Sequence, residues 1–263
     1  MAKISNTFIP KHTVIERIHP MTKILAVFSL GLGTLVFPYL WIGPVIVIGL
    51  FAVAWLGRIL KEFARVMFGF GIPVTAMLLF IQGCYYPGNV TVIADLGFAQ
   101  VGLEGIRYAA KIICTLFVFL GTFYIMNKTT YSGKLVAALT QSGLPPKAGY
   151  LVLASLNVVP QMQKRMAVIK EAQEARGVET GGNLFARIKA YIPLLGPVVM
   201  SSLTDAQERG MTLETRGFGI QGVKQTTYVE VSKTHTDKAV NVFLVLFFIV
   251  ALAASALMKF GLI

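Results

Sequence analysis

The chain has 263 residues, of which 55% are hydrophobic and 14% are charged, and it carries a formal net charge of +12. Soluble proteins average about 25% charged residues, so this composition excludes an ordinary soluble domain and predicts that much of the surface faces lipid. The basic residues collect between the long apolar runs rather than within them, which is typical of cytoplasmic loops and not of a nucleic-acid-binding surface.

The N-terminal residues and the two cysteines indicate how the protein reaches the membrane and which kinds of site it lacks. Residues 1–20 are polar and mixed, without a small-residue cleavage site before Met21, so we expect the first spanning helix to direct the protein to the membrane. The basic residues within 1–23 predict an N-terminus on the cytoplasmic side of the cell membrane. The two cysteines, Cys84 and Cys114, make neither a disulfide framework nor a metal site.

Five apolar segments are predicted to cross the membrane as helices, because no strand pattern of any length competes with them. Four of them form an N-terminal membrane region over residues 1–126, and the fifth forms a C-terminal transmembrane helix within residues 239–263. The first two are each near the minimum of about 17 residues for a crossing and form a tight hairpin. The fold class is therefore an all-α polytopic membrane protein, with predicted spans at 24–40, 41–56, 66–85, 106–126 and 239–260.

A polar loop separates the third and fourth segments. It contains Asp95 and Glu104 but no lysine or arginine, so the distribution of positive charge predicts that it lies outside the cell. Arg107 and Lys111 follow near the outer end of the fourth segment, where positive charge is unusual. Their side chains either reach along the helix to the membrane interface or contact a partner subunit, and the sequence leaves both alternatives open.

Residues 127–238 form the longest stretch without a membrane span. They hold 14 lysine and arginine residues against 8 aspartate and glutamate residues, which predicts a cytoplasmic helical region. Two apolar runs inside it, 148–159 and 190–203, are too short to cross a bilayer and are expected to be buried or interfacial helices. Each run continues into a charged amphipathic helix, predicted over 161–176 and over about 197–216.

Both charged helices end in a similar short motif, forty positions apart: Ala175-Arg176-Gly177 and Thr215-Arg216-Gly217. Glycine is the natural residue just past a helix end, and arginine in the last turn favours the negative end of the helix dipole. A single such end is ordinary capping. Two of them in one cytoplasmic region indicate a pair of arginines able to form bidentate pairs with carboxylates of another protein. The second helix is expected to pass through Gly210 at a cost of about 1 kcal/mol.

We call the helix end at residues 175–177 the first tip and the helix end at residues 215–217 the second tip. With these two motifs the chain resembles the transmembrane T component of energy-coupling factor (ECF) transporters, which are ATP-driven importers of vitamins and transition-metal ions. That family carries two Ala-Arg-Gly-type motifs at the ends of two cytoplasmic coupling helices. Thr215 departs from the motif but leaves its arginine and glycine in place. Three further stretches are similar to the family: the opening before the first span, the lead into the fourth segment and the exit from the second coupling helix, at 17–23, 102–106 and 216–218.

The resemblance implies partners and roles for these residues. T components bind two cytoplasmic ATPase subunits through the coupling helices and one membrane-embedded substrate-binding subunit through their hydrophobic surfaces. Arg176 and Arg216 would engage acidic residues in grooves of the ATPases, one motif per subunit. The residue before each arginine, Ala175 or Thr215, would allow close packing, and the glycine after it, Gly177 or Gly217, would end the helix. ATP and magnesium would be bound by the partner ATPases, and the chain itself would carry no cofactor and no catalytic residue.

Other functions fit the sequence less well. There is no phosphate-binding loop of the Gly-x-x-x-x-Gly-Lys-Ser/Thr type, and the histidines at 12, 19 and 235 are scattered, which argues against an ATPase and a membrane enzyme. The main alternative is a secondary transporter, or another polytopic membrane protein, that works without ATPase partners. A secondary transporter would place ionisable residues in mid-membrane and show repeated halves, whereas these spans hold almost no charge away from their ends. The transported substrate does not follow from the sequence.

Overall fold

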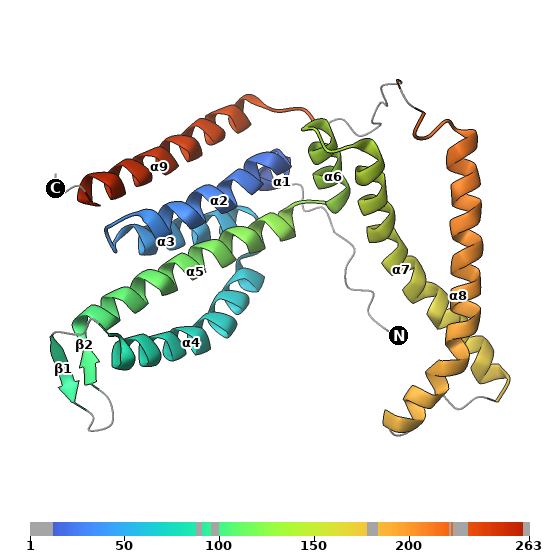
Figure 1. Ribbon diagram of the computed structural model, residues 1–263, viewed down its shortest axis with the longest axis horizontal. Coiled ribbons are helices and arrows are strands. Elements are labelled where there is room, and N and C mark those ends of the chain that lie inside the picture. The colour runs from blue at the N-terminus through green and yellow to red at the C-terminus, as the bar shows by residue number, and fades with distance from the viewer. Residues whose placement is uncertain are drawn as a thin grey trace. The chain divides into compact units, whose positions relative to one another are not determined.

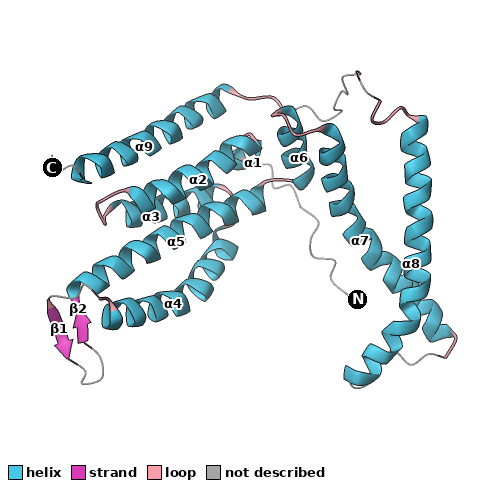
Figure 2. Ribbon diagram, viewed as in Figure 1, coloured by secondary structure: helices cyan, strands magenta, loops and turns pink. Residues whose placement is uncertain are grey.

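The computed structural model describes residues 13–87, 91–95, 100–177, 184–220, 222 and 231–259, and among these it contains nine helices and one short hairpin. Figure 2 shows how completely helix dominates, so the predicted all-α class is confirmed. The chain divides into two compact units, which are Thr7–Ala138 with Glu230–Ile263, and Met1–Asn6 with Leu139–Val229. We call the first unit the bundle. The predicted N-terminal approach up to residue 12 and the chain beyond residue 259 lie outside the described residues.

The bundle is built around one long central helix, α5 (Leu103–Thr129). Three helices pack on it, namely α2 (Pro20–Val36), α3 (Ile42–Leu56) and α4 (Leu60–Tyr85), as Figure 1 shows. The last helix, α9 (His235–Lys259), packs on α2, and the short α1 (Val14–Arg17) lies against α3. A core of apolar side chains from these elements centres on Phe63, which is fully buried and meets Phe51 edge-on at 5.0 Å.

Three bundle helices are long and apolar enough to cross a membrane: Leu60–Tyr85, Leu103–Thr129 and His235–Met258, with 26, 27 and 24 residues. The other two apolar helices, α2 and α3, have 17 and 15 residues and are shorter than the usual span of about 20. Large apolar side chains on α3 and beside it are exposed, with Trp41 82% and Ile48 70% accessible. Water would disfavour such a surface and lipid would not, so the bundle has the surface of a multi-pass membrane protein. The count of five crossings stays a prediction.

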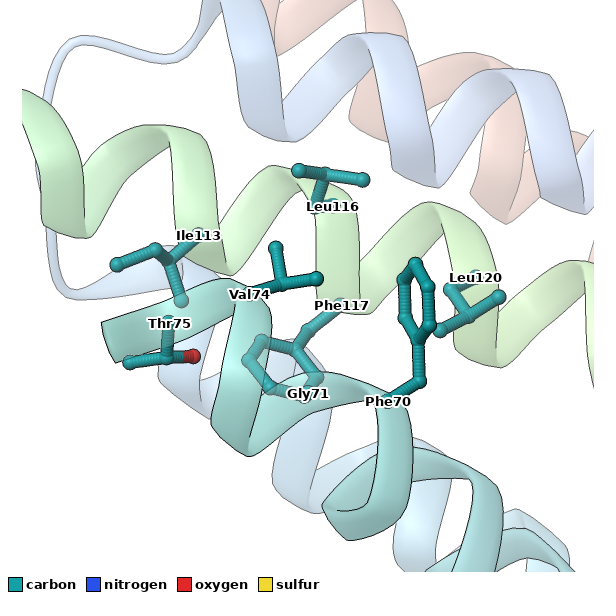
Figure 3. Close-up of a pocket in the computed structure, with 8 residues that line it drawn as sticks. All are labelled: Phe70, Gly71, Val74, Thr75, Ile113, Leu116, Phe117 and Leu120. Carbon is teal, nitrogen blue, oxygen red and sulfur yellow. The ribbon is translucent and has the colours of Figure 1, made fainter. Parts of the chain in front are cut away.

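Small residues let the bundle helices approach closely. In α4, a Cβ atom added at Gly71 would lie 2.3 Å from the ring of Phe117 in α5, so a larger residue there would require this ring to move. Pro73 follows two residues later inside the same helix and removes one backbone hydrogen bond. Beside this contact lies an apolar crevice whose one hydroxyl belongs to Thr75 (Figure 3). Its lining therefore suits packing or lipid contact rather than chemistry.

The predicted outer loop contains the hairpin, a feature that the sequence did not reveal. Strands β1 (Val92–Asp95) and β2 (Gln100–Gly102) pair antiparallel, and they are too short for an alternating pattern to show. Glu104, at the end of this loop, accepts hydrogen bonds from the backbone N–H and hydroxyl of Thr91 at 3.2 and 2.8 Å. Arg107 is exposed and Lys111 half-buried, which fits both the interfacial and the partner-contact interpretation.

The second unit consists chiefly of two long helices, α7 (Pro146–Ala175) and α8 (Leu184–Thr215), preceded by α6 (Ser132–Gln141), which begins in the bundle. We call α7 and α8 the helix pair. In each, the apolar run and the charged run that were expected as successive segments form one continuous helix. Pro160 lies within α7 and does not end it. The prediction that α8 continues through Gly210 is confirmed.

Candidate partner-binding site

Polar contacts near the middle of α7 and α8 join the two helices of the pair. The guanidinium of Arg165 in α7 forms an ion pair with Asp205 in α8 at 2.5 Å and also donates a hydrogen bond to the hydroxyl of Ser201 at 3.1 Å. Next to it, the hydroxyl of Ser202 lies 3.4 Å from the sulfur of Met162. The ion pair is partly exposed, with 29% and 43% of the two side chains accessible, so it contributes less than about 1 kcal/mol to stability. Its geometry nevertheless sets where the helices cross.

The residues that meet where α7 and α8 cross have the same spacing in sequence as the two tips. Arg165 and Asp205 are forty positions apart, as are Met162 and Ser202, and this is the same spacing that separates the two motif arginines. The helices therefore cross at equivalent points along their lengths. Each motif arginine lies eleven residues past its crossing residue, or about 16 Å along the helix axis. The C-terminal ends of α7 and α8 extend in opposite directions from the crossing (Figure 1).

The first tip is an exposed helix end with a left-handed glycine. Arg176 is the C-cap of α7, and Gly177 follows with φ +86°. The N–H of Gly177 donates to the carbonyl of Glu174 at 3.0 Å, which closes the last turn. Among the described residues, no side chain lies within 4 Å of an added Cβ, and the positive φ is the reason that this position favours glycine. Ala175, Arg176 and Gly177 are all exposed.

The second tip is a complete Schellman motif. Gly217 has φ +71°, its N–H donates to the carbonyl of Glu214 at 3.0 Å, and the N–H of Phe218 donates to the carbonyl of Leu213 at 2.9 Å. The hydroxyl of Thr215 bonds back to the carbonyl of Thr212 at 3.0 Å, as a helical threonine can and an alanine cannot. Thr215 and Arg216 are exposed.

The second tip is also attached to the start of α7, a contact that the sequence analysis missed. The ring of Phe218 packs on Tyr150 with centroids 5.0 Å apart. A Cβ atom at Gly219, where φ is +86°, would lie 2.7 Å from the side chain of Lys147. Tyr150 and Lys147 are distant from the motif in sequence, and no local pattern could have identified them. The tip of α8 is thus packed against the first turns of α7.

Both tips carry an exposed positive charge. Among the residues that the structure describes, neither Arg176 nor Arg216 forms an ion pair, whereas Lys170 and Glu174 on α7 pair at 3.6 Å. A free guanidinium at an exposed helix end can accept a carboxylate in a bidentate pair. In the same described part of the chain, no group of three or more histidine, cysteine, aspartate or glutamate residues could hold a metal ion. The six predicted site residues therefore lie together in two sets of three, one per tip.

Comparison with known proteins identifies the family of the whole chain. The profile of the family described as "Cobalt transport protein" (CbiQ) matches residues 11–229. The chain is similar to the "Energy-coupling factor transporter transmembrane protein EcfT" of Listeria innocua, with 28% identity over 82% of this chain and 84% of that protein. The same-named protein of Bacillus subtilis is 28% identical over 92% of this chain and 94% of its own length, and that of Lactococcus lactis is 27% identical over 80% and 82%. The chain therefore belongs to the CbiQ family and is the transmembrane component of an energy-coupling factor transporter.

Proposed function

We propose that this chain couples two cytoplasmic ATPases to a membrane-embedded substrate-binding subunit and so drives the uptake of vitamins or transition-metal ions across the cell membrane. ATP and magnesium bind to the ATPases, and the chain contributes no catalytic residue. The helix pair lies on the cytoplasmic side, and each of its tips docks in a groove of one ATPase. Closure of the ATPases on ATP moves the tips, and the movement reorients the substrate-binding subunit.

One observation carries this proposal: two exposed arginines stand at equivalent distances beyond a shared helix crossing. A pair of similar sites, each eleven residues past the crossing, suits two partners of similar shape. The left-handed glycines at 177 and 217 end both helices, so each motif arginine stands at the end of its helix, where a groove of a partner can receive it. Force applied at a tip reaches the crossing along a continuous helix.

The partner in the membrane is expected on apolar surface. Exposed large apolar side chains lie in the first half of α7, at 151, 152, 156 and 159, and in the middle of α8, at 192, 195, 199 and 200, whereas charged residues gather toward both C-terminal ends. An apolar surface of this extent on a helix is typical of a contact with another protein or with lipid. In this proposal, the substrate-binding subunit contacts these exposed apolar stretches while the ATPases contact the charged tips.

Charge reversal at both tips tests the proposal. The double substitution Arg176→Glu and Arg216→Glu should leave the protein inserted in the membrane but separate it from co-expressed ATPases, because a carboxylate would face the acidic residues of each groove. The matched control is Lys164→Glu with Arg209→Glu, which makes the same change in net charge on the same two helices away from the tips. Arg209 even precedes a glycine, as the motif arginines do.

The readout is the subunit composition of the purified complex and its rate of ATP hydrolysis. The control should retain both ATPases, and the tip variant should lose them. A tip variant that purifies as an intact, hydrolysing complex would show that the tips are not the docking sites. Uptake that needs no ATPase would instead favour the alternative, a secondary transporter. The membrane proteins that co-purify would show which cargo is carried and whether one substrate-binding subunit or several share this chain.

A further inference from the structure

The two connections between the bundle and the helix pair meet at one end of the bundle. The chain passes from the bundle to the helix pair through α6, which directly follows α5, and it re-enters the bundle just before α9; the end of α5 and the start of α9 lie beside the start of α2 (Figure 1). Two charged side chains are buried at this end, Lys23 with 8% and Asp237 with 1% of their surface accessible. Burying a charge is costly unless hydrogen bonds replace the water it loses, so the partners of these two groups matter.

Lys23 ties the start of α2 to the end of α5. Its ammonium group donates three hydrogen bonds, to the carbonyl and hydroxyl of Thr129 at 2.9 and 3.0 Å and to the hydroxyl of Thr130 at 3.1 Å. All three of its N–H groups are therefore satisfied. The carbonyl of Thr129 is among the last four of α5, which have no partner within the helix and stand at the negative end of its dipole.

Asp237 ties the start of α2 to the start of α9. One carboxylate oxygen accepts a hydrogen bond from the backbone N–H of His19 at 2.8 Å, and the other accepts from the N–H of Thr234 at 2.8 Å. The second bond has the form of one half of a capping box on α9. His19 in turn accepts from the N–H of Met21 at 3.2 Å and so caps α2.

We infer that Lys23 and Asp237 form a joint through which movement of the helix pair passes into the bundle. The apolar contacts of the core are non-directional, and one buried hydrogen bond, from the hydroxyl of Ser29 to the carbonyl of Leu244 at 2.6 Å, also links α2 to α9. At this end, by contrast, five charge-assisted hydrogen bonds hold three helix ends in one geometry. The joint grips both connections of the helix pair, so displacement of either one reaches α2. Lys23 and Asp237 are positioning residues for transport, and the inference rests on the proposed coupling function.

Hydrogen exchange in the assembled complex tests the joint. The protein is purified with its co-expressed ATPases, and exchange is compared with and without a non-hydrolysable ATP analogue and Mg²⁺. The test variants are Lys23→Met, which removes three hydrogen bonds while keeping an unbranched apolar stem, and Asp237→Asn, which keeps the shape but removes the charge. The matched control is Lys128→Met, because Lys128 is the neighbour of Thr129 and makes an exposed ion pair with Glu62 at 2.9 Å.

In the unsubstituted complex and in the Lys128→Met control, nucleotide should change exchange both at the ends of α7 and α8 and in the first turns of α2 and α9. In the Lys23→Met and Asp237→Asn complexes, the change at the tips should persist and the change in α2 and α9 should be lost. A defect confined to stability would raise exchange in α2 but leave its dependence on nucleotide intact, and that result would overturn the inference. Thr130→Val, which removes one bond only, carries the same test if Lys23→Met does not assemble.

This experiment separates the joint from the proposed function. If nucleotide changes exchange at neither the tips nor the bundle of the unsubstituted complex, the coupling function itself fails. If it changes exchange at the tips but not in α2 and α9 of the unsubstituted complex, the coupling function stands and the joint is refuted.

Discussion

The backbone at the second tip leads to a prediction in which one substitution, made at two glycines of α8, has opposite effects. Gly217 has φ +71°, in the left-handed region, whereas Gly210 lies inside the regular helix. Alanine at 217 must adopt a conformation that costs roughly 1–2 kcal/mol. Alanine at 210 removes the entropic cost of a glycine in a helix, worth about 1 kcal/mol. In the part of the chain that the structure describes, no side chain lies within 4 Å of an added Cβ at Gly210, so these residues leave room for the methyl group.

The expected changes concern the last turn of α8. Gly217→Ala should disfavour the Schellman motif, because the N–H groups of Gly217 and Phe218 keep their carbonyl partners only while residue 217 is left-handed. A cost of 1–2 kcal/mol raises the population of the frayed tip by about 5- to 30-fold. Gly210→Ala should lower that population by up to about 5-fold. An added Cβ at Gly217 would also lie 3.0 Å from the side chain of Ile220, which can move aside.

Amide hydrogen exchange of the isolated protein in detergent measures both effects, because exchange of a helix end reports its local opening free energy. Amides of residues 213–218 should exchange faster in Gly217→Ala and more slowly in Gly210→Ala. Amides of α7, apart from its first turns, should be unchanged in both. Equal or reversed changes in exchange would refute the explanation that position 217 requires glycine because of its left-handed backbone.

Two further predictions concern single contacts. Phe218→Ala should lower the free energy of unfolding of the helix pair by about 1 kcal/mol, because the ring contact with Tyr150 is lost. Phe218→Tyr keeps an aromatic ring and should retain most of this free energy. Denaturant titration measures both variants, and equal losses would show that the ring contact contributes nothing. Burial lowers the pKa of His19 below its ordinary value of 6.5, so the unfolded chain binds more protons and the stability of the fold should fall as the pH drops through 6.5. This fall should be smaller in His19→Asn, because asparagine can still cap α2 but does not titrate. An unchanged dependence of stability on pH in His19→Asn would exclude His19 as the cause of the fall.

Much of the fold followed from sequence because membranes impose a simple rule. Long apolar runs flanked by basic residues must become helices in lipid, and those at 66–85, 106–126 and 239–260 correspond to α4, α5 and α9. These helices are longer than the predicted spans, because polar residues beyond the apolar run continue the helix, as residues 60–65 do at the start of α4. The hairpin was missed because strands of four and three residues carry too little pattern.

The two tips were readable for a local reason. A glycine just past an amphipathic run predicts a helix end whatever surrounds it, and the left-handed φ angles of Gly177 and Gly217 confirm both ends. The binding role of Arg176 and Arg216 stays a prediction. Their unpaired state among the described residues is what such a role requires.

By itself, the sequence determined the helical class, the family and the position of both tips, because these depend on hydropathy, charge and short motifs read along the chain. Only the tertiary structure decided which residues meet across it. Arg165 pairs with Asp205, Phe218 packs on Tyr150, and Lys23 bonds to the end of α5, because packing brings distant segments together. A lysine at the start of an apolar helix looks like an interfacial charge in sequence. Once packing has removed its water, it must find hydrogen-bond partners, and those lie 106 residues further along the chain.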